Sequence, residues 1–499
     1  MAKRLRTWKA PILGALLAAA LSGSAYAATP AAPASSPGTA IAIMQASAAL
    51  QANDCAAALA PLNQLWNDPY LENSDPDMAA SFRLRLIACT AEKSGLQEAI
   101  SLSAENLDRK GSGLTAFDMH AFLQLMAQQP AAAADTLDAA MTRFPDHAAD
   151  LSDMTVLGTL LQLHDANGPR ELAMLDHMEQ VHWQTHILAA RQMLGLLRIE
   201  GLRAAVSTGR ADVAALYRAD IKTDAYSYMI VEGDGTLSQA NVGPDAVEPI
   251  IAAQINEAKA AFVKTPTDLL TLSYLMGLER ADGQSGTALT QLNGVIALID
   301  QYGLGNFSSP ETYPQLLGIR GQLLADTGQF NEALAAFQDG AKRVEGMNNG
   351  DFYVAYASYL VARGDDKGAI ALIDGLNVAS LSDAQKEMLI ASDACAFGRL
   401  GDKNYASFMH VIGDAPLRIR PHLCAGDTEG AAADLKSSIG TPPLRETAIL
   451  LMQDTPQGLP ASDKDGAVDN AINALKSRPD VVDAAAKAAI ITRAWPLKY

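Results

Sequence analysis

Apolar residues recur at helical spacing along most of the chain. From Thr39 onward they lie three and four residues apart, and Gly, Pro, Asn or Asp interrupts the pattern about every 15–20 residues. This periodicity predicts amphipathic helices joined by short turns. Alanine is abundant and aromatic residues make up only 6% of the chain, which also favours helix over sheet. We therefore expect an all-α fold.

One stretch carries the most regular form of this pattern. Residues 314–345 read PQLLGIRGQLLADTGQFNEALAAFQDGAKRVE, with small residues where two helices would cross and Gly where the chain would turn. The stretch resembles the tetratricopeptide repeat, a helix–turn–helix unit of about 34 residues. The positions that match the repeat pattern are Gly321, Gly328, Ala333, Phe337 and Gly340.

The small residues of this unit have a physical reason. Two antiparallel helices of a hairpin pack closely where small side chains face each other, and Gly321 and Ala333 would provide that contact. Phe337 would fill the space towards the next repeat. One hairpin cannot bury its own apolar faces, so neighbouring hairpins must stack on it. The resemblance implies a solenoid of helical hairpins, with weaker copies over 39–148 and 350–373; a plain helical bundle without true repeats is the alternative.

Two interruptions divide the predicted helices. The segment 220–249 combines Tyr and Met-Ile-Val with several Gly and Pro residues, which predicts an irregular or β-hairpin-like, non-helical insert. The segment 453–466 reads QDTPQGLPASDKDG and predicts a linker. We expect an N-terminal repeat array over 39–219, a C-terminal array over 250–452, and a terminal helical hairpin over 467–499 that caps the stack.

The first residues follow the pattern of a secretory signal peptide. A basic start precedes an apolar run over 10–21, and small residues stand at Ala25 and Ala27. The apolar run is shorter than the roughly 20 residues that span a bilayer. We expect cleavage after Ala27, with residues 1–27 removed and 28–38 forming a flexible leader; an uncleaved anchor is the alternative. The protein would then be periplasmic or secreted, without a membrane span, and the Ala-rich signal sequence is typical of a bacterial protein.

The charge of the chain limits its partners. It holds 38 Lys and Arg against 56 Asp and Glu, a net charge of −18 at pH 7. Loss of residues 1–27, which contain four basic and no acidic residues, would change the net charge to −22. Nucleic acid is a poor partner for such a surface. A protein partner with basic or neutral segments is expected instead.

The four cysteines are an even number in an exported chain, which predicts two disulfides. Four cysteines allow three connectivities. Because successive helices of such a stack run antiparallel, the start of one helix and the end of the next should meet, which favours Cys55 with Cys89. Cys395 and Cys424 would form the second pair. Four buried free thiols are the alternative.

The sequence offers little that points to catalysis. Glu179, His182 and His186 are spaced to share one helical face, but no further cluster completes a metal site, so no metal is predicted. The nucleophile-elbow, phosphate-binding and dinucleotide-binding motifs are missing from the sequence, so neither a catalytic residue nor a cofactor is predicted. Paired carboxylates such as Asp365-Asp366 stand at turns, where they stabilise helix starts.

A concave protein-binding face is the functional feature that the repeat resemblance implies. Tyr353, Tyr356 and Tyr359 lie three residues apart and are candidates to line it; packing between repeats is the alternative reading. We expect a non-catalytic periplasmic protein that mediates protein–protein interaction or assembly of an envelope or secretion complex. Two alternatives are open: an enzyme acting on cell-wall glycan within a helical superstructure, and a structural component of a polysaccharide export apparatus.

Overall fold

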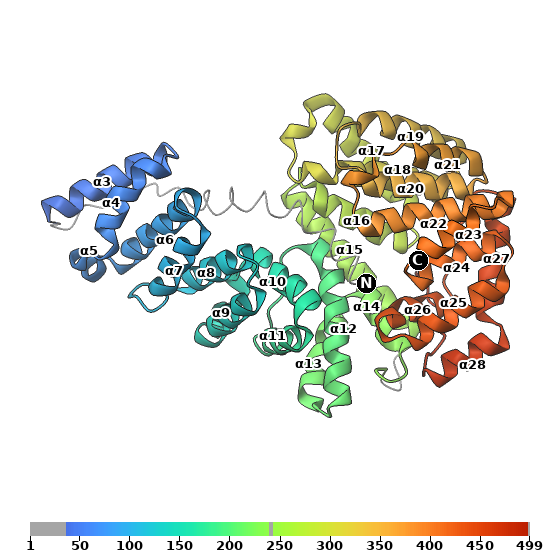
Figure 1. The fold of residues 1–499 in the computed structure, drawn as a ribbon, viewed down its shortest axis with the longest axis horizontal. Helices are drawn as coiled ribbons and strands as arrows, with labels where there is room; N and C mark the ends of the chain where they lie inside the picture. Colours follow the sequence, from blue (N-terminus) through green and yellow to red (C-terminus); the bar gives the residue numbers. More distant parts are fainter. Residues whose placement is uncertain (1–35, 239–242, 498–499) are drawn as a thin grey trace. The chain divides into compact units, whose positions relative to one another are not determined.

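The computed structural model describes residues 36–238 and 243–497 (Figure 1). In these ranges the regular structure is entirely helical, and the only β-type pairings are three isolated bridges. The all-α prediction is confirmed. The predicted signal peptide over 1–27 lies outside the described residues, as does most of the predicted leader. None of the described helices has the length and apolarity that crossing a bilayer requires.

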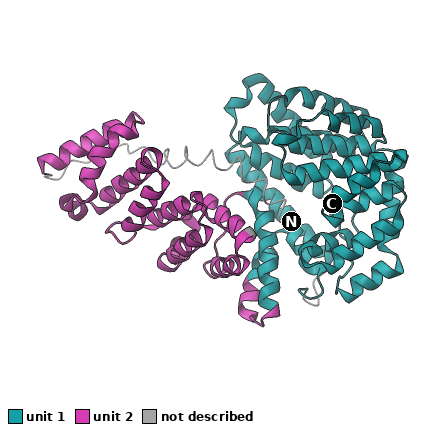
Figure 2. Cartoon of the chain, viewed as in Figure 1, with its two compact units in different colours: residues 1–9, 188–206, 217–499 teal, residues 10–187, 207–216 magenta. Residues whose placement is uncertain are grey.

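The described chain divides into two compact units (Figure 2). The N-terminal unit holds the residues up to 187 together with 207–216, and the C-terminal unit holds 188–206 and the residues from 217 onward. The division therefore begins near residue 188, earlier than the interruption at 220–249. Helix α12 (Arg191–Ser207) explains the difference, because it packs on helix α14 (Ala225–Gly233): a Cβ at Gly195 would lie 2.1 Å from the Ser227 hydroxyl.

The N-terminal unit is a row of helices in which each packs mainly on its neighbours in sequence. Acidic caps begin several of them: Asp54 and Asp75 accept hydrogen bonds from the backbone N–H three residues later, at 3.0 and 2.9 Å. Its helices are α3 (Pro37–Gln51), α4 (Cys55–Trp66), α5 (Pro69–Ser74), α6 (Pro76–Lys93), α7 (Leu96–Asn106), α8 (Leu114–Met126), α9 (Pro130–Arg143), η2 (Pro145–Asp150), α10 (Asp153–Ala166), α11 (Gly168–Gln180) and the start of α13 (Ala211–Ile221).

The C-terminal unit contains the hairpins that resemble tetratricopeptide repeats. The first helices of successive hairpins, α16, α18, α20, α22 and α24, pack side by side. Besides α12 and α14, its α-helices are α15 (Val247–Lys264), α16 (Leu269–Ala281), α17 (Ser285–Tyr302), α18 (Tyr313–Asp326), α19 (Phe330–Arg343), α20 (Gly350–Ala362), α21 (Asp366–Asp374), α22 (Asp383–Leu400), α23 (Tyr405–Val411), α24 (Ala415–Cys424), α25 (Thr428–Gly440), α26 (Arg445–Met452), α27 (Asp463–Lys476) and α28 (Pro479–Lys487).

Close packing in the best-matched repeat depends on its glycines. A Cβ at Gly321 on α18 would lie 2.4 Å from the ring of Phe337 on α19, and a Cβ at Gly340 would lie 2.6 Å from the ring of Phe352 on α20. Ala333 and Phe337 are fully buried. Gly328 forms the turn with φ +78°, a left-handed conformation that glycine adopts without strain.

The segment expected to be a non-helical insert is mostly helical. Helix α14 occupies 225–233, and the Asp224 carboxylate caps it by accepting a hydrogen bond from the Ser227 N–H at 2.8 Å. Among the described residues of 220–249, the parts outside helices are 222–224, 234–238 and Gly243. The aromatic and branched residues that indicated a strand are instead buried on several sides of the helix, so tertiary packing outweighed β-propensity.

The last helices begin and end earlier than the sequence pattern indicated. Helix α27 starts at Asp463, and α28 ends at Lys487. Between α26 and α27, residues 455–460 have no regular structure. Helix α27 packs on α20, α24 and α25, while α28 packs on α25. The terminal pair therefore contacts several hairpins of the C-terminal unit, in addition to the last one.

Candidate functional site

A groove of about 520 Å³ lies on the face formed by the first helices of the C-terminal hairpins. The first helices α16, α18, α20, α22 and α24 all contribute to its wall, as does α27, and Gly458, Leu459 and Ala461 form part of its rim. We refer to this hollow as the groove. Its apolar surface includes four alanines together with Val354, Met388 and Leu417; the alanines are Ala325, Ala355, Ala362 and Ala391.

The charged side chains of the groove are paired with one another. Arg280 donates to Asp326 at 2.6 Å. Arg420 donates to Asp465 and lies 3.5 Å from Asp469. Burial raises the pKa of Asp469, against the opposing effect of Arg420. Three carboxylates therefore face two guanidinium groups, which leaves the groove slightly acidic.

The irregular segment beside the groove is held at its C-terminal end. The Ser462 hydroxyl donates to the Ala362 carbonyl at 2.6 Å, and the Lys464 ammonium donates to Asp366 at 2.8 Å. Leu459 lies near the turn at Gly328 and is 61% exposed.

The three tyrosines expected to line a groove mostly pack between repeats. Tyr356 stacks on Phe337 with ring centroids 5.1 Å apart, and Tyr359 stacks on the same ring at 5.1 Å. The Tyr359 hydroxyl donates to a backbone carbonyl, and only Tyr359 of the three reaches the groove. Tyr353 packs edge-on against Phe352 and is absent from the groove lining. Phe337 and Phe352 fill the space beside Gly321 and Gly340, and Tyr356 and Tyr359 stack on Phe337, while Val354, Ala355 and Ser358 of α20 face the groove.

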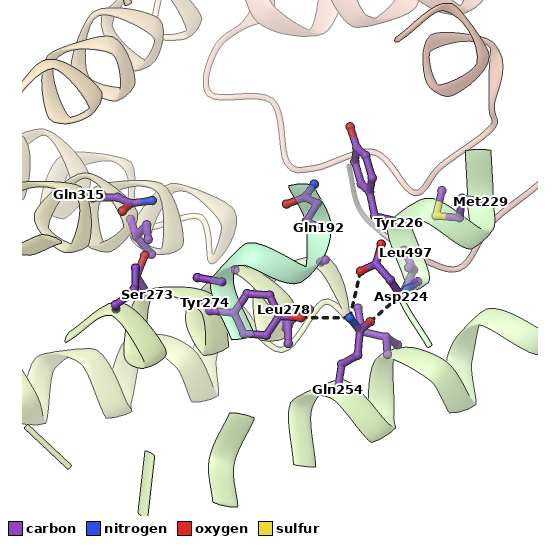
Figure 3. Close-up of a pocket in the computed structure, with 17 residues that line it drawn as sticks. Gln192, Asp224, Tyr226, Met229, Gln254, Ser273, Tyr274, Leu278, Gln315 and Leu497 are labelled. Carbon is purple, nitrogen blue, oxygen red and sulfur yellow. Dashed lines mark hydrogen bonds between the residues drawn. The ribbon is translucent and has the colours of Figure 1, made fainter. Parts of the chain in front are cut away.

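A second hollow, the inner pocket, has a volume of about 380 Å³ and lies among α12, α14, α15, α16 and α18 (Figure 3). Three polar side chains meet in it. The Gln254 amide donates to the Asp224 carboxylate and to the Tyr274 hydroxyl oxygen, both at 3.0 Å. The Gln254 carbonyl accepts from the Ala225 N–H at 3.0 Å. Burial and the nearby Asp224 raise the pKa of Tyr274, so its phenol stays neutral.

Both predicted disulfide pairs are present. Cys55, the first residue of α4, is bonded to Cys89 near the end of α6. Cys395 on α22 is bonded to Cys424 at the end of α24. The second bond ties together two helices that line the groove, and Cys395 itself is part of the groove wall.

The helical face proposed for Glu179, His182 and His186 does not form. Helix α11 ends at Gln180, so the two histidines lie beyond it, and His182 has a left-handed backbone with φ +54°. His186 is exposed and lies 3.4 Å from Asp153. The three side chains therefore do not share the spacing that would point them at one ion.

Neither hollow was predictable residue by residue from the sequence. Asp224, Gln254 and Tyr274 come from three elements, and no motif links them. The only sequence signal for the groove is the small-residue content of α18, α20 and α22. Small residues also occur where helices pack on each other, as at the fully buried Ala333, so their presence does not identify a groove.

Comparison with known proteins does not name a family for this chain. No protein-family model and no curated protein sequence matches it. Among solved structures, yeast Tom70 aligns over 89% of this chain and 98% of its own, with 10% identity and a TM-score of 0.30. Naa15/Naa10 bound to HypK-THB aligns over 90% and 96%, with 11% identity and a TM-score of 0.23. At these TM-scores neither alignment supports an inference about this chain, and the hairpin packing described above carries the fold assignment by itself.

Proposed function

We propose that this protein binds an extended segment of a partner protein in the groove. The observation that carries the proposal is the continuity of the groove across α18, α20, α22 and α24, the first helices of successive hairpins. Such a surface presents a similar helix face at regular intervals, which suits an extended chain more than a compact ligand. The small residues on the groove wall leave room for a backbone to approach.

The chemistry of the groove restricts the segment that it would accept. Its apolar wall favours small or medium apolar side chains. Its carboxylates outnumber its guanidinium groups, and the whole chain carries a net charge of −18. We therefore expect a partner segment that is neutral or basic, because an acidic one would be repelled during approach.

We further propose that the protein acts in the periplasm as a non-catalytic component of an envelope or secretion assembly. Two features support this setting. The first is the signal-peptide pattern of residues 1–27. The second is the pair of disulfides, because such bonds persist in oxidising compartments.

Site-specific photo-crosslinking in producing cells tests the proposal. A photoreactive amino acid is placed at Ser358, which is exposed in the groove wall, and separately at Ser437, which is exposed on α25 and lies outside the groove lining. We expect a defined crosslinked product from position 358 and none from 437. The product should disappear when Ala391→Trp on the facing wall fills the groove.

Two results would overturn the proposal. One is the same set of products from both positions, which would indicate non-specific contact. The other is a product from position 358 that persists unchanged in the filled-groove variant. Mass spectrometry of the crosslinked peptide would then identify the partner and show whether the captured segment is neutral or basic.

A further inference from the structure

We propose that the inner pocket binds a neutral, largely apolar group that offers one hydroxyl or carbonyl oxygen to the Tyr274 hydroxyl. This site is distinct from the groove and does not depend on the function proposed for it. The chemical class is that of an alkylphenol, an alcohol or an amide with an apolar body.

The shape and lining of the pocket fit such a ligand. Its volume of about 380 Å³ falls in the range of small-molecule sites, which span roughly 300–1,000 Å³. Most of its wall is aliphatic, and a few polar groups converge at one place, which is the usual composition of a ligand site. The apolar lining includes Met229, Ile251, Leu270, Leu278, Ile319 and Leu497.

The hydrogen bonds around Gln254 leave the Tyr274 hydroxyl proton as a donor for a ligand. Both N–H groups of the Gln254 amide are used, one by the Asp224 carboxylate and one by the Tyr274 oxygen. The Gln254 side-chain carbonyl accepts a hydrogen bond from the Ala225 backbone N–H, which fixes the orientation of the amide against a flip. The Tyr274 oxygen is therefore an acceptor in this network, and its own proton is directed elsewhere. Figure 3 shows Tyr274 and Gln254 joined in this way among the residues that line the pocket.

The charges around the pocket exclude ionic ligands. The Asp224 carboxylate is buried and also accepts hydrogen bonds from the Ser227 N–H and hydroxyl, so both of its oxygens already have partners within the protein. Its charge opposes an anion. Arg191, the nearby cation, is paired with both oxygens of Glu257. A cationic ligand would lose its hydration against aliphatic walls without gaining a free counter-ion.

The ligand oxygen has two possible sources with the same chemistry. It could belong to a free small molecule, or to the side chain of a bound polypeptide, such as a tyrosine. Gln315 and Ile319 of the pocket lie on the same helix, α18, as Gln322 and Asp326 of the groove. A polypeptide segment bound in the groove would therefore extend along α18 to reach the pocket.

The test uses p-cresol and toluene as probes, which differ by one hydroxyl, with binding measured by ligand-observed NMR. We expect p-cresol to bind about fivefold more tightly than toluene, the effect of one net hydrogen bond. In Tyr274→Phe, toluene binding should be unchanged and the preference for p-cresol should fall. A preference of undiminished size in Tyr274→Phe would overturn the assignment of the donor.

A second variant blocks the pocket without disturbing the fold. Gly277 on α16 lines the pocket, and a Cβ there would meet no atom within 4 Å, so Gly277→Leu should fill the space. Gly294 on α17 is the matched control, because its Cβ would also meet no atom and it lies outside the pocket. We expect Gly277→Leu to abolish binding of both probes and Gly294→Leu to retain it. Failure of both probes to bind the unmodified protein would overturn the proposal.

A third probe, the tripeptide N-acetyl-Gly-Tyr-Gly-amide, separates the two sources. If the ligand is a side chain of a polypeptide, the tripeptide should bind the unmodified protein at least as tightly as p-cresol does. Its binding should be lost in Gly277→Leu. If the pocket serves free molecules, p-cresol should bind and the tripeptide should not. Both results support the site, and crosslinking in the groove remains an independent measure of the function proposed above.

Discussion

Arg445 forms a bidentate ion pair with Asp234, which lies 211 residues earlier in the chain. The Arg445 Nε and Nη2 atoms lie 2.8 and 2.7 Å from the two carboxylate oxygens, and Asp234 is fully buried. Burial by itself would raise the pKa of Asp234, but the hydrogen bonds from Arg445 and Thr236 lower it overall. Arg445 also donates to the Ala488 carbonyl at 2.6 Å. One arginine thus joins the end of α14 to α26 and to the residues after α28, all within the C-terminal unit.

Asp234→Asn should strongly destabilise the C-terminal unit. The substitution removes the counter-charge of Arg445, whose side chain is only 14% exposed, and loss of one partner of a largely buried pair typically costs about 3–5 kcal/mol. Urea unfolding should show the loss, and hydrogen exchange should accelerate in α14 and α26. Asp339→Asn is the control, because Asp339 pairs with Arg343 in an exposed position and should cost at most about 0.5 kcal/mol. Equal effects of the two substitutions would contradict the structural role of the buried pair.

Gly321→Ala should destabilise the best-matched repeat. Its new Cβ would lie 2.4 Å from the Phe337 ring, and overpacking of this kind costs about 1–3 kcal/mol. Gly294→Ala, in an open position, should instead stabilise by up to about 1 kcal/mol through helix propensity. In thermal unfolding, Phe337→Leu should be less harmful in the Gly321→Ala background than alone. Strict additivity of the two substitutions would show that the residues do not compete for space.

Replacement of Cys395 and Cys424 by serine should lower the unfolding free energy of the C-terminal unit by about 3 kcal/mol. The bond closes a loop of 29 residues, and its removal frees the unfolded chain. Reductant should have the same effect on the C-terminal unit of the unmodified protein and none on that unit in the double variant, whose remaining disulfide lies in the N-terminal unit. Peptide mapping without reductant should recover Cys55 linked to Cys89 and Cys395 linked to Cys424. Recovery of four free thiols from mature protein would refute both bonds.

Asp393 should make stability depend on pH. Burial and the nearby Asp374 raise its pKa to about 7, from an ordinary value of 3.8. Between pH 3.8 and about 7, the folded state holds a proton on Asp393 that the unfolded state has lost. The contribution of this carboxyl group to the free energy of unfolding is therefore fully present below pH 3.8 and is lost as the pH rises to about 7. Asp393→Asn should therefore raise the melting temperature at pH 8 and change it little at pH 4. Parallel pH profiles for the variant and the unmodified protein would contradict this assignment.

Helix identity and local pairing followed from the sequence because they depend on near neighbours. The spacing of apolar residues marked most helices, and turn glycines such as Gly328 marked where hairpins reverse. Cys55 and Cys89 could be paired because antiparallel neighbours bring the start of one helix to the end of the next. The tyrosines of α20 were ambiguous, because periodicity places them on a face without saying which neighbour covers it.

Tertiary structure decided the features that join distant parts of the chain. The strand-like residues of 225–233 became helix α14 because the surrounding helices bury them on several sides. The pair of Asp234 with Arg445, and the meeting of Asp224, Gln254 and Tyr274, depend on how hairpins are stacked. A periodic sequence specifies each hairpin through contacts a few residues apart. The curvature that brings its distant turns together is a sum of many small packing angles, and no local pattern encodes that sum.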